Sequence, residues 1–66
     1  MKAAELRKKM TTYGEGEITV KTKSGATGNI EFTEGSYSFI KHKGKSCIDT
    51  GRYVIPTTMV MEVTSY

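Results

Sequence analysis

The chain has 66 residues, which suffices for one small domain and excludes a second folded unit. Leu, Ile, Val and Phe together supply only 12 of these residues, a thin core for a domain of this size. We therefore expect a homo-oligomer, in which a neighbouring subunit completes the core. Ten Lys and Arg residues against seven Asp and Glu residues give a net charge of +3, which favours polyanionic partners.

The cysteine content and the hydropathy pattern indicate the compartment. Cys47 is the only cysteine, so no internal disulfide can form, and small secreted domains usually carry several. No apolar run approaches the length of a membrane span, and the N-terminus lacks the apolar segment of a signal peptide. We therefore expect a soluble, cytoplasmic protein without a membrane partner.

The first residues predict a short amphipathic helix over Lys2 to Met10. Ala3, Leu6 and Met10 recur at helical spacing, and Glu5 lies one turn before the following lysines. Two glycines, at positions 14 and 16, then end the helix. A helix this short is marginal in isolation, so we expect its apolar stripe to pack on the rest of the chain.

The remainder of the chain is rich in Val, Ile and Thr and predicts a sheet. Alternating apolar and polar residues, bounded by glycines and Pro56, indicate strands at 17–23, 28–33, 37–43, 46–48, 52–55 and 59–64. Gly44 would form the tip of the hairpin that joins the third and fourth of these runs. In the last run, Met59, Met61 and Val63 would share one face.

We interpret these runs as about five short strands, and the protein as mainly β, with a short N-terminal helix followed by a five-stranded, strongly bent antiparallel barrel. Each strand has one well-populated apolar face, and closing the sheet hides edges that a flat sheet would expose. The expected organisation is a single small β-barrel domain over residues 1–66, of the SH3, OB or Sm type. The helix and its connector occupy 1–13, and the strands occupy 16–66.

The densest cationic feature is the predicted hairpin tip Lys41-His42-Lys43-Gly44-Lys45. Alternate lysines on one strand face, next to a glycine that lets a backbone approach, suit phosphate groups. The same lysines also serve a simpler purpose, because charged hairpin tips block edge-to-edge aggregation. Lys21, Lys23 and Arg52 would extend the patch if their strands lie beside it.

Aromatic residues on a basic sheet can stack nucleic-acid bases. Tyr37, Phe39 and Tyr53 are the candidates, and Tyr37 is the one that we include in the predicted ligand site. Packing in the core is the competing interpretation for each ring, most strongly for Phe39.

No catalytic or cofactor site is indicated by the sequence. His42 and Cys47 are the only strong soft-metal ligands apart from methionine thioethers, whereas a zinc site needs three or four ligands. The carboxylates are scattered, and no general acid and base can be paired among them. We therefore expect a protein that is not an enzyme and has no metal or cofactor.

The apolar residues near the C-terminus predict an interface between copies of the chain. Short strands at the edge of a small sheet expose unpaired main-chain groups, which a neighbouring subunit can complete. The residues that we expect in this interface are Val54, Ile55, Met59, Met61 and Val63.

The overall pattern resembles the Sm/Hfq-like small β-barrel family across nearly the whole chain. The shared features are a short N-terminal helix, five bent strands with Gly28 inside the second, and a Pro56-Thr57-Thr58 corner before the last strand. The resemblance implies a ring in which the fourth strand of one subunit pairs with the fifth of the next. It also implies RNA or nucleotide binding on that ring. Gly35-Ser36 stands where the family carries an Asp/Asn pair, so its RNA-binding residues do not carry over.

Two functions follow from these observations. The first is a self-assembling, non-catalytic module that binds a nucleic acid, a nucleotide or another phosphorylated ligand through its lysine-rich surface. The second is a small protein-interaction module, an inhibitor or regulator that caps a larger protein or adds an edge strand to it.

Overall fold

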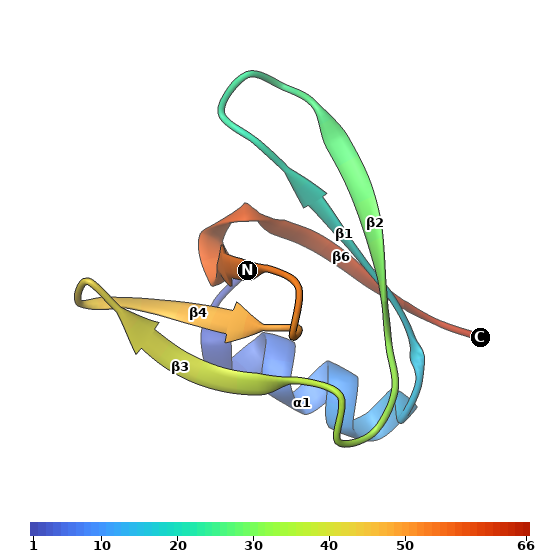
Figure 1. The fold of residues 1–66 in the computed structure, drawn as a ribbon. Coiled ribbons are helices and arrows are strands. Elements are labelled where there is room, and N and C mark those ends of the chain that lie inside the picture. Colours follow the sequence, from blue (N-terminus) through green and yellow to red (C-terminus); the bar gives the residue numbers. More distant parts are fainter.

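The structure, a computed structural model, describes all residues from 1 to 66 as one N-terminal helix and six strands. The elements are α1 (Ala3–Tyr13), β1 (Gly16–Lys21), β2 (Thr27–Phe32), β3 (Ser38–His42), β4 (Lys45–Asp49), β5 (Val54–Pro56), a 3₁₀ turn η1 (Thr57–Met59) and β6 (Val60–Ser65) (Figure 1). The protein is therefore mainly β with one short helix, as the sequence predicts. The chain contains no helix with the length and apolar character needed to cross a membrane.

Helix α1 extends three residues beyond the predicted Met10 and buries the predicted stripe. Leu6 and Met10 are fully buried, and Glu5 pairs with Lys9 at 3.8 Å. The helix ends at Gly14, whose φ of 77° is a left-handed conformation that favours glycine. The main-chain N–H of Gly14 donates to the carbonyl of Met10 at 2.9 Å and caps the last turn.

The first sheet has the antiparallel order β2-β1-β6. Ile18, at its centre, faces Ile30 on one side and Val63 on the other, so these side chains share the inner face. A bulge shifts the register of β6 next to Thr19 and Val20, which leaves Met61 as the additional residue. Val60 and Val63 are consequently buried, whereas Met61 is 58% exposed. The expectation that Met59, Met61 and Val63 share one face is wrong for this reason.

The second sheet has the antiparallel order β3-β4-β5. Its central strand, β4, pairs Ile48 with Phe39 of β3 and with Ile55 of β5. Ile48 and Ile55 are buried, and Phe39 is half-buried against them. The predicted hairpin between β3 and β4 is confirmed.

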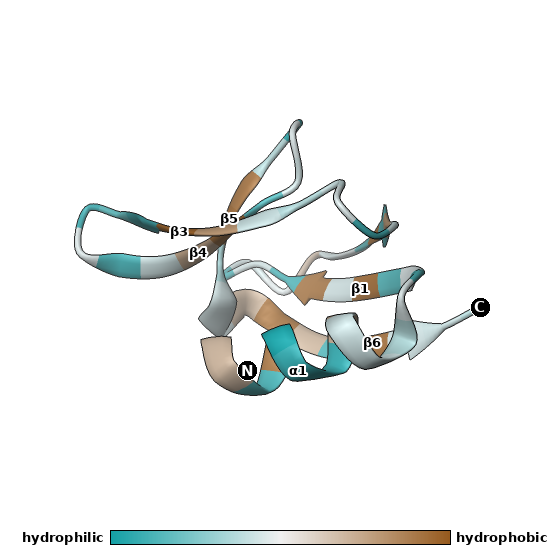
Figure 2. Ribbon diagram, turned by 90° about the horizontal axis from the view of Figure 1, so that it is seen from below, coloured by the Kyte–Doolittle hydropathy of each residue, from teal (hydrophilic) through white to brown (hydrophobic).

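The two sheets do not close into the predicted five-stranded barrel. Six strands form two separate three-stranded sheets, and no strand ladder joins one sheet to the other. Between β2 and β3, Gly35 has a φ of 80° and Thr33 and Ser36 form a hydrogen-bonded turn. The chain therefore passes from the first sheet to the second through a turn and not through a continuous bent strand. Helix α1 lies along one side of the assembly, and hydrophobic segments occur in the helix and in both sheets (Figure 2).

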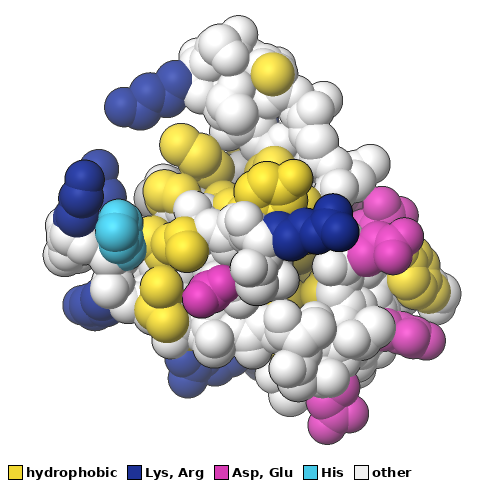
Figure 3. Space-filling view, viewed as in Figure 1, with side chains coloured by type: hydrophobic (Ala, Val, Ile, Leu, Met, Phe, Trp, Pro, Cys, Tyr) yellow, Lys and Arg dark blue, Asp and Glu magenta, His cyan; other side chains and the backbone are white.

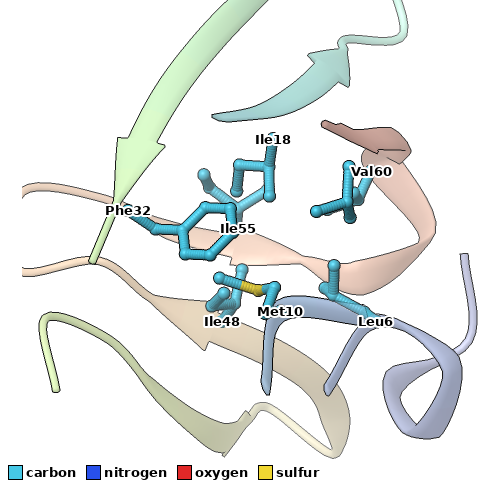
Figure 4. Close-up of a cluster of buried hydrophobic side chains, with 8 residues drawn as sticks. Leu6, Met10, Ile18, Phe32, Ile48, Ile55 and Val60 are labelled. Carbon is cyan, nitrogen blue, oxygen red and sulfur yellow. The ribbon is translucent and has the colours of Figure 1, made fainter. Parts of the chain in front are cut away.

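One hydrophobic core holds the helix and the two sheets together. Its members come from α1, β1, β2, β4, β5 and β6, and seven of them are labelled in Figure 4. They are Leu6, Met10, Ile18, Phe32, Ile48, Ile55, Val60 and Val63. No buried side-chain nitrogen or oxygen lacks a hydrogen-bond partner. The core is therefore small but free of unsatisfied polar groups.

We predict that Gly16→Ala destabilises the fold, by about 1–3 kcal/mol for an overpacked position. A Cβ at Gly16 would collide with the main-chain carbonyl of Thr64, which cannot move without distorting β6. Gly28→Ala, in the neighbouring strand, is the matched control because a Cβ there meets no atom within 4 Å. Urea unfolding should show a lower midpoint for the first variant alone. Equal midpoints for the two variants would contradict the packing of β1 against β6.

Candidate ligand-binding site

The β3–β4 hairpin ends in a tight turn that displays cationic side chains. His42 pairs with Lys45, so Lys43 and Gly44 alone form the turn. Their φ values are 53° and 77°, and positive φ at both positions defines a type I′ turn. Lys41, His42, Lys43 and Lys45 are all exposed, and we call these four residues the basic tip.

The turn places the lysines on different faces of the hairpin. Lys41 lies opposite Ser46, whereas Lys45 lies opposite His42. Since neighbouring residues of a strand point to opposite faces, Lys41 and Lys45 project from opposite faces of the sheet. The expectation that the alternate lysines share one face is therefore wrong, because the two-residue turn reverses their phase. The lysine side chains therefore surround the end of the hairpin with positive charge.

No carboxylate neutralises the basic tip. The one ion pair in the structure joins Lys9 to Glu5 on α1. On the face shown in Figure 3, most Lys, Arg and His side chains gather at one side and most Asp and Glu side chains at the other, with hydrophobic side chains between them. The surface therefore has a cationic side that includes the tip.

Carboxylates near the C-terminus form the opposite pole. The pKa of Tyr66 is raised from its ordinary value by reduced hydration, then by hydrogen bonding to Glu31, and then by the negative charges of Glu31, Glu17 and Glu15. Each of these charges opposes ionisation of the phenol. The carboxylates therefore gather at the end of the molecule where Tyr66 lies.

The remaining predicted cations lie on other elements. Lys21 ends β1, Lys23 lies in the turn after it, and Arg52 lies in the loop between β4 and β5. All three are exposed. The β1–β2 hairpin and the β3–β4 hairpin project from the body in different directions (Figure 1). Lys21 and Lys23, on the β1–β2 hairpin, are therefore not part of the basic tip.

The aromatic candidates differ in their availability. Tyr37 lies between Phe32 and Phe39, with ring centroids 5.8 and 5.9 Å apart and edge-to-face geometry at both contacts. The guanidinium of Arg7 covers the ring of Phe39 at 4.8 Å. Tyr53, in contrast, is 54% exposed. Of the three rings, Tyr53 is thus the one that is free to stack on a ligand.

A hollow of about 950 Å³ lies between the start of α1, β4 and η1. Lys45 of the basic tip lines it together with Lys2, Thr57 and Thr58, but Glu5 also faces it. The hollow therefore presents both signs of charge and does not by itself select an anion.

Sequence reasoning missed a groove between β2 and the β4–β5 region. Two adjoining hollows, of about 300 and 440 Å³, share Asn29, Ile30 and Tyr53 as lining residues. We call them together the β2–β5 groove. Val20 and Ile30 line this groove and are only half-buried because the barrel is open. Arg52 and Tyr53 are the two candidates from the sequence that line this groove.

Comparison with known proteins gives no relative: no family model, no curated protein and no solved structure matches the chain. The structure brings together no group of three or more His, Cys, Asp or Glu side chains that could hold a metal ion. Cys47 is buried in β4, at 2% exposure. The candidate residues on the surface instead offer the ammonium groups of the lysines, the guanidinium of Arg52 and the aromatic ring of Tyr53.

We predict that Lys43→Asn leaves the hairpin intact and stabilises it by a few tenths of a kcal/mol. Asparagine tolerates positive φ better than lysine, and Asn-Gly is the preferred type I′ turn. Urea unfolding measures the change, with Lys45→Asn as the control because Lys45 has ordinary strand geometry. A loss of stability in the first variant would contradict the turn type.

Proposed function

We propose that this protein is a small, non-catalytic binding module that holds a nucleic acid, a nucleotide or another phosphorylated ligand on its basic tip. The observation that supports this proposal is the absence of any paired carboxylate around Lys41, Lys43 and Lys45. Four of the five positions from 41 to 45 carry lysine or histidine. Such unpaired cations attract phosphates and release the counterions that phosphates hold.

The arrangement of the tip favours a chain of phosphates over one phosphate. Lys41 and Lys45 project from opposite faces, and Lys43 lies at the turn between them. Single phosphates are usually held by convergent donors, such as main-chain N–H groups or a bidentate arginine. Divergent lysines instead act as separate point charges, which suit successive phosphates of a flexible strand. Single-stranded nucleic acid is therefore the ligand that we favour.

We predict that replacing Lys41, Lys43 and Lys45 by Ser, Asn and Ser abolishes binding of a single-stranded oligonucleotide. The fold should remain, because exposed substitutions usually change stability by less than about 0.5 kcal/mol each. Fluorescence anisotropy with a labelled oligonucleotide at several salt concentrations measures the effect. The slope of log affinity against log salt should become shallower by about 0.7 for each phosphate that the variant no longer neutralises.

The matched control removes the same charge from another place. Lys2, Lys8 and Lys9 lie on or beside α1, and replacing all three by Gln lowers the net charge equally. This variant should bind more weakly but keep most of its salt dependence. If both triple variants bind alike, attraction is due to net charge alone, and the tip is not the site.

A second function is favoured by a different observation. Val54 and Met61 are 47% and 58% exposed, and β2 and β3 each have one edge without a neighbouring strand. Exposed apolar side chains and open edges are features of protein-interaction modules that add a strand to a partner or cap it. Retention of one protein partner at high salt, without oligonucleotide binding, would favour this inhibitor or regulator function.

The same features support self-association. Of the five residues expected in an interface between copies, Ile55 and Val63 belong to the core of the single chain, and Met59 is half-buried. Val54 and Met61 remain available on the surface. The proposed interface is therefore narrower than the sequence indicated, and these two side chains are its candidates.

We predict that Met61→Glu combined with Val54→Glu converts an oligomer into monomers. Both side chains are exposed in the single chain, so the charges should not disturb its core, but they would be buried in the interface. Light scattering at micromolar concentration measures the mass. Tyr13→Glu, at a 40% exposed position on α1, is the control. A monomeric mass for the unmodified protein would remove the proposal of self-association.

A further inference from the structure

The β2–β5 groove has an apolar part and a polar part that meet at Tyr53. The apolar part, of about 300 Å³, is lined by Val20, Ile30, Ile55 and Met59 together with the Tyr53 ring. The polar part, of about 440 Å³, adds Glu31, Thr50 and Arg52. Pockets of 300–1,000 Å³ that combine apolar walls with a few polar groups are typical small-molecule sites.

The apolar part suits a flat ring. The aromatic face of Tyr53 is half exposed beside it, while Ile55 is buried and Ile30 half-buried in its walls. Gly28 also lines it, and no atom stands within 4 Å of the Cβ that Gly28 lacks. The groove is therefore open enough for a planar group to enter between the side chains and contact the ring.

The polar part holds two opposite charges that do not pair with each other. Arg52 and Glu31 line the same hollow, yet neither takes part in an ion pair. The guanidinium is thus available for an anion, and the carboxylate can accept hydrogen bonds from hydroxyl groups. The hydroxyl of Thr50 lies nearby but is engaged with the carbonyl of Tyr53 at 3.3 Å.

The outer edge of β2 supplies further hydrogen-bonding groups. β2 pairs with β1 alone, and no turn, loop or side-chain hydrogen bond reaches the main chain of Thr27–Phe32. Alternate N–H and C=O groups on this edge are consequently free beside the groove. A ligand with both donors and acceptors on its rim would satisfy them.

We propose that the β2–β5 groove binds a nucleoside phosphate, either free or as one unit of a single strand. The base lies in the apolar part against Tyr53, with its edge toward the free edge of β2. The sugar hydroxyls face Glu31, and the phosphate pairs with Arg52. This inference rests on the proposed function and deepens it, because it adds a base-binding subsite to a module whose basic tip attracts the phosphate chain.

A peptide strand is a weaker candidate for the same groove. A strand that closes the barrel needs hydrogen-bonding partners on both sides, but β5 has three residues and ends in Pro56, which lacks an N–H. An anionic group on the ligand could also pair with the free guanidinium of Arg52, and an extended main chain provides no such group. The groove therefore fits an amphipathic, anionic small unit better than a strand.

The experiment is a titration of ¹⁵N-labelled protein with adenosine monophosphate, adenosine and inorganic phosphate, followed by amide chemical shifts. We expect the monophosphate to shift the amides of Ile30, Tyr53 and Met59 more than those of the basic tip. Tyr53→Ala should weaken binding of the monophosphate and of adenosine by about tenfold or more, as loss of a stacked aromatic does. Arg52→Gln should weaken binding of the monophosphate by about tenfold and leave the affinity for adenosine unchanged. Tyr13→Ala, which removes another exposed ring, should change the affinity for neither ligand.

Other outcomes separate the two proposals. If neither adenosine nor its monophosphate shifts the groove amides, while an oligoadenylate binds through the basic tip, the base subsite is wrong and the proposed function stands. If the monophosphate binds the groove but oligonucleotide binding does not depend on the tip lysines, the tip site is wrong and the groove stands. If an extended peptide shifts the amides of β2 and the nucleotide shifts none of them, the proposal of a base-binding subsite is wrong. The groove would then be a site at which a partner adds a strand.

Discussion

The packing of α1 against one side of the two sheets is the interaction on which the rest of the structure depends. No ladder joins β2-β1-β6 to β3-β4-β5, so the sheets are held together by side-chain packing, by the connecting segments and by the hydrogen bonds from the Met1 ammonium to the carbonyls of Thr57 and Val60. Leu6 and Met10 of the helix meet residues of both sheets in a core of eight side chains. Each such side chain contributes about 1.5–3 kcal/mol when fully buried. The helix thus provides the connection that a closed barrel would obtain from its backbone.

The same arrangement determines which surfaces remain for binding. The helix contacts β6 and reaches Phe39 of β3 through Arg7, so it covers one opening between the sheets. The opposite opening, between β2 and β5, has no such cover, and its inward-facing side chains line a groove instead of a core. The β3–β4 hairpin extends beyond the core and needs no apolar residues at its end. The proposed sites are therefore consequences of an incompletely closed fold.

Local patterns allowed the elements to be predicted, whereas contacts between distant segments did not follow from them. The stripe of Leu6 and Met10, the alternation around Ile18 and the glycine at the hairpin tip each act within a few residues, and each is confirmed. The bulge at Met61 depends on how β6 meets β1, and the division into two sheets depends on which strands pair along their edges. The basic tip was predictable as a cluster of residues, but the faces of its lysines depend on the turn type. The groove was not predictable, because it exists only where two sheets fail to join.

Cys47 can serve as a chemical reporter of local opening around the second sheet. Its thiol is the only one in the chain and lies in the central strand of the second sheet, between Ile40 and Pro56. A reagent that modifies thiols cannot reach it in the folded chain, since the residue is 2% exposed and Ala3 and Arg7 of α1 line a hollow beside it. Its rate of modification therefore follows the local opening of the helix from the second sheet. A ligand that holds the helix on this sheet will slow the modification.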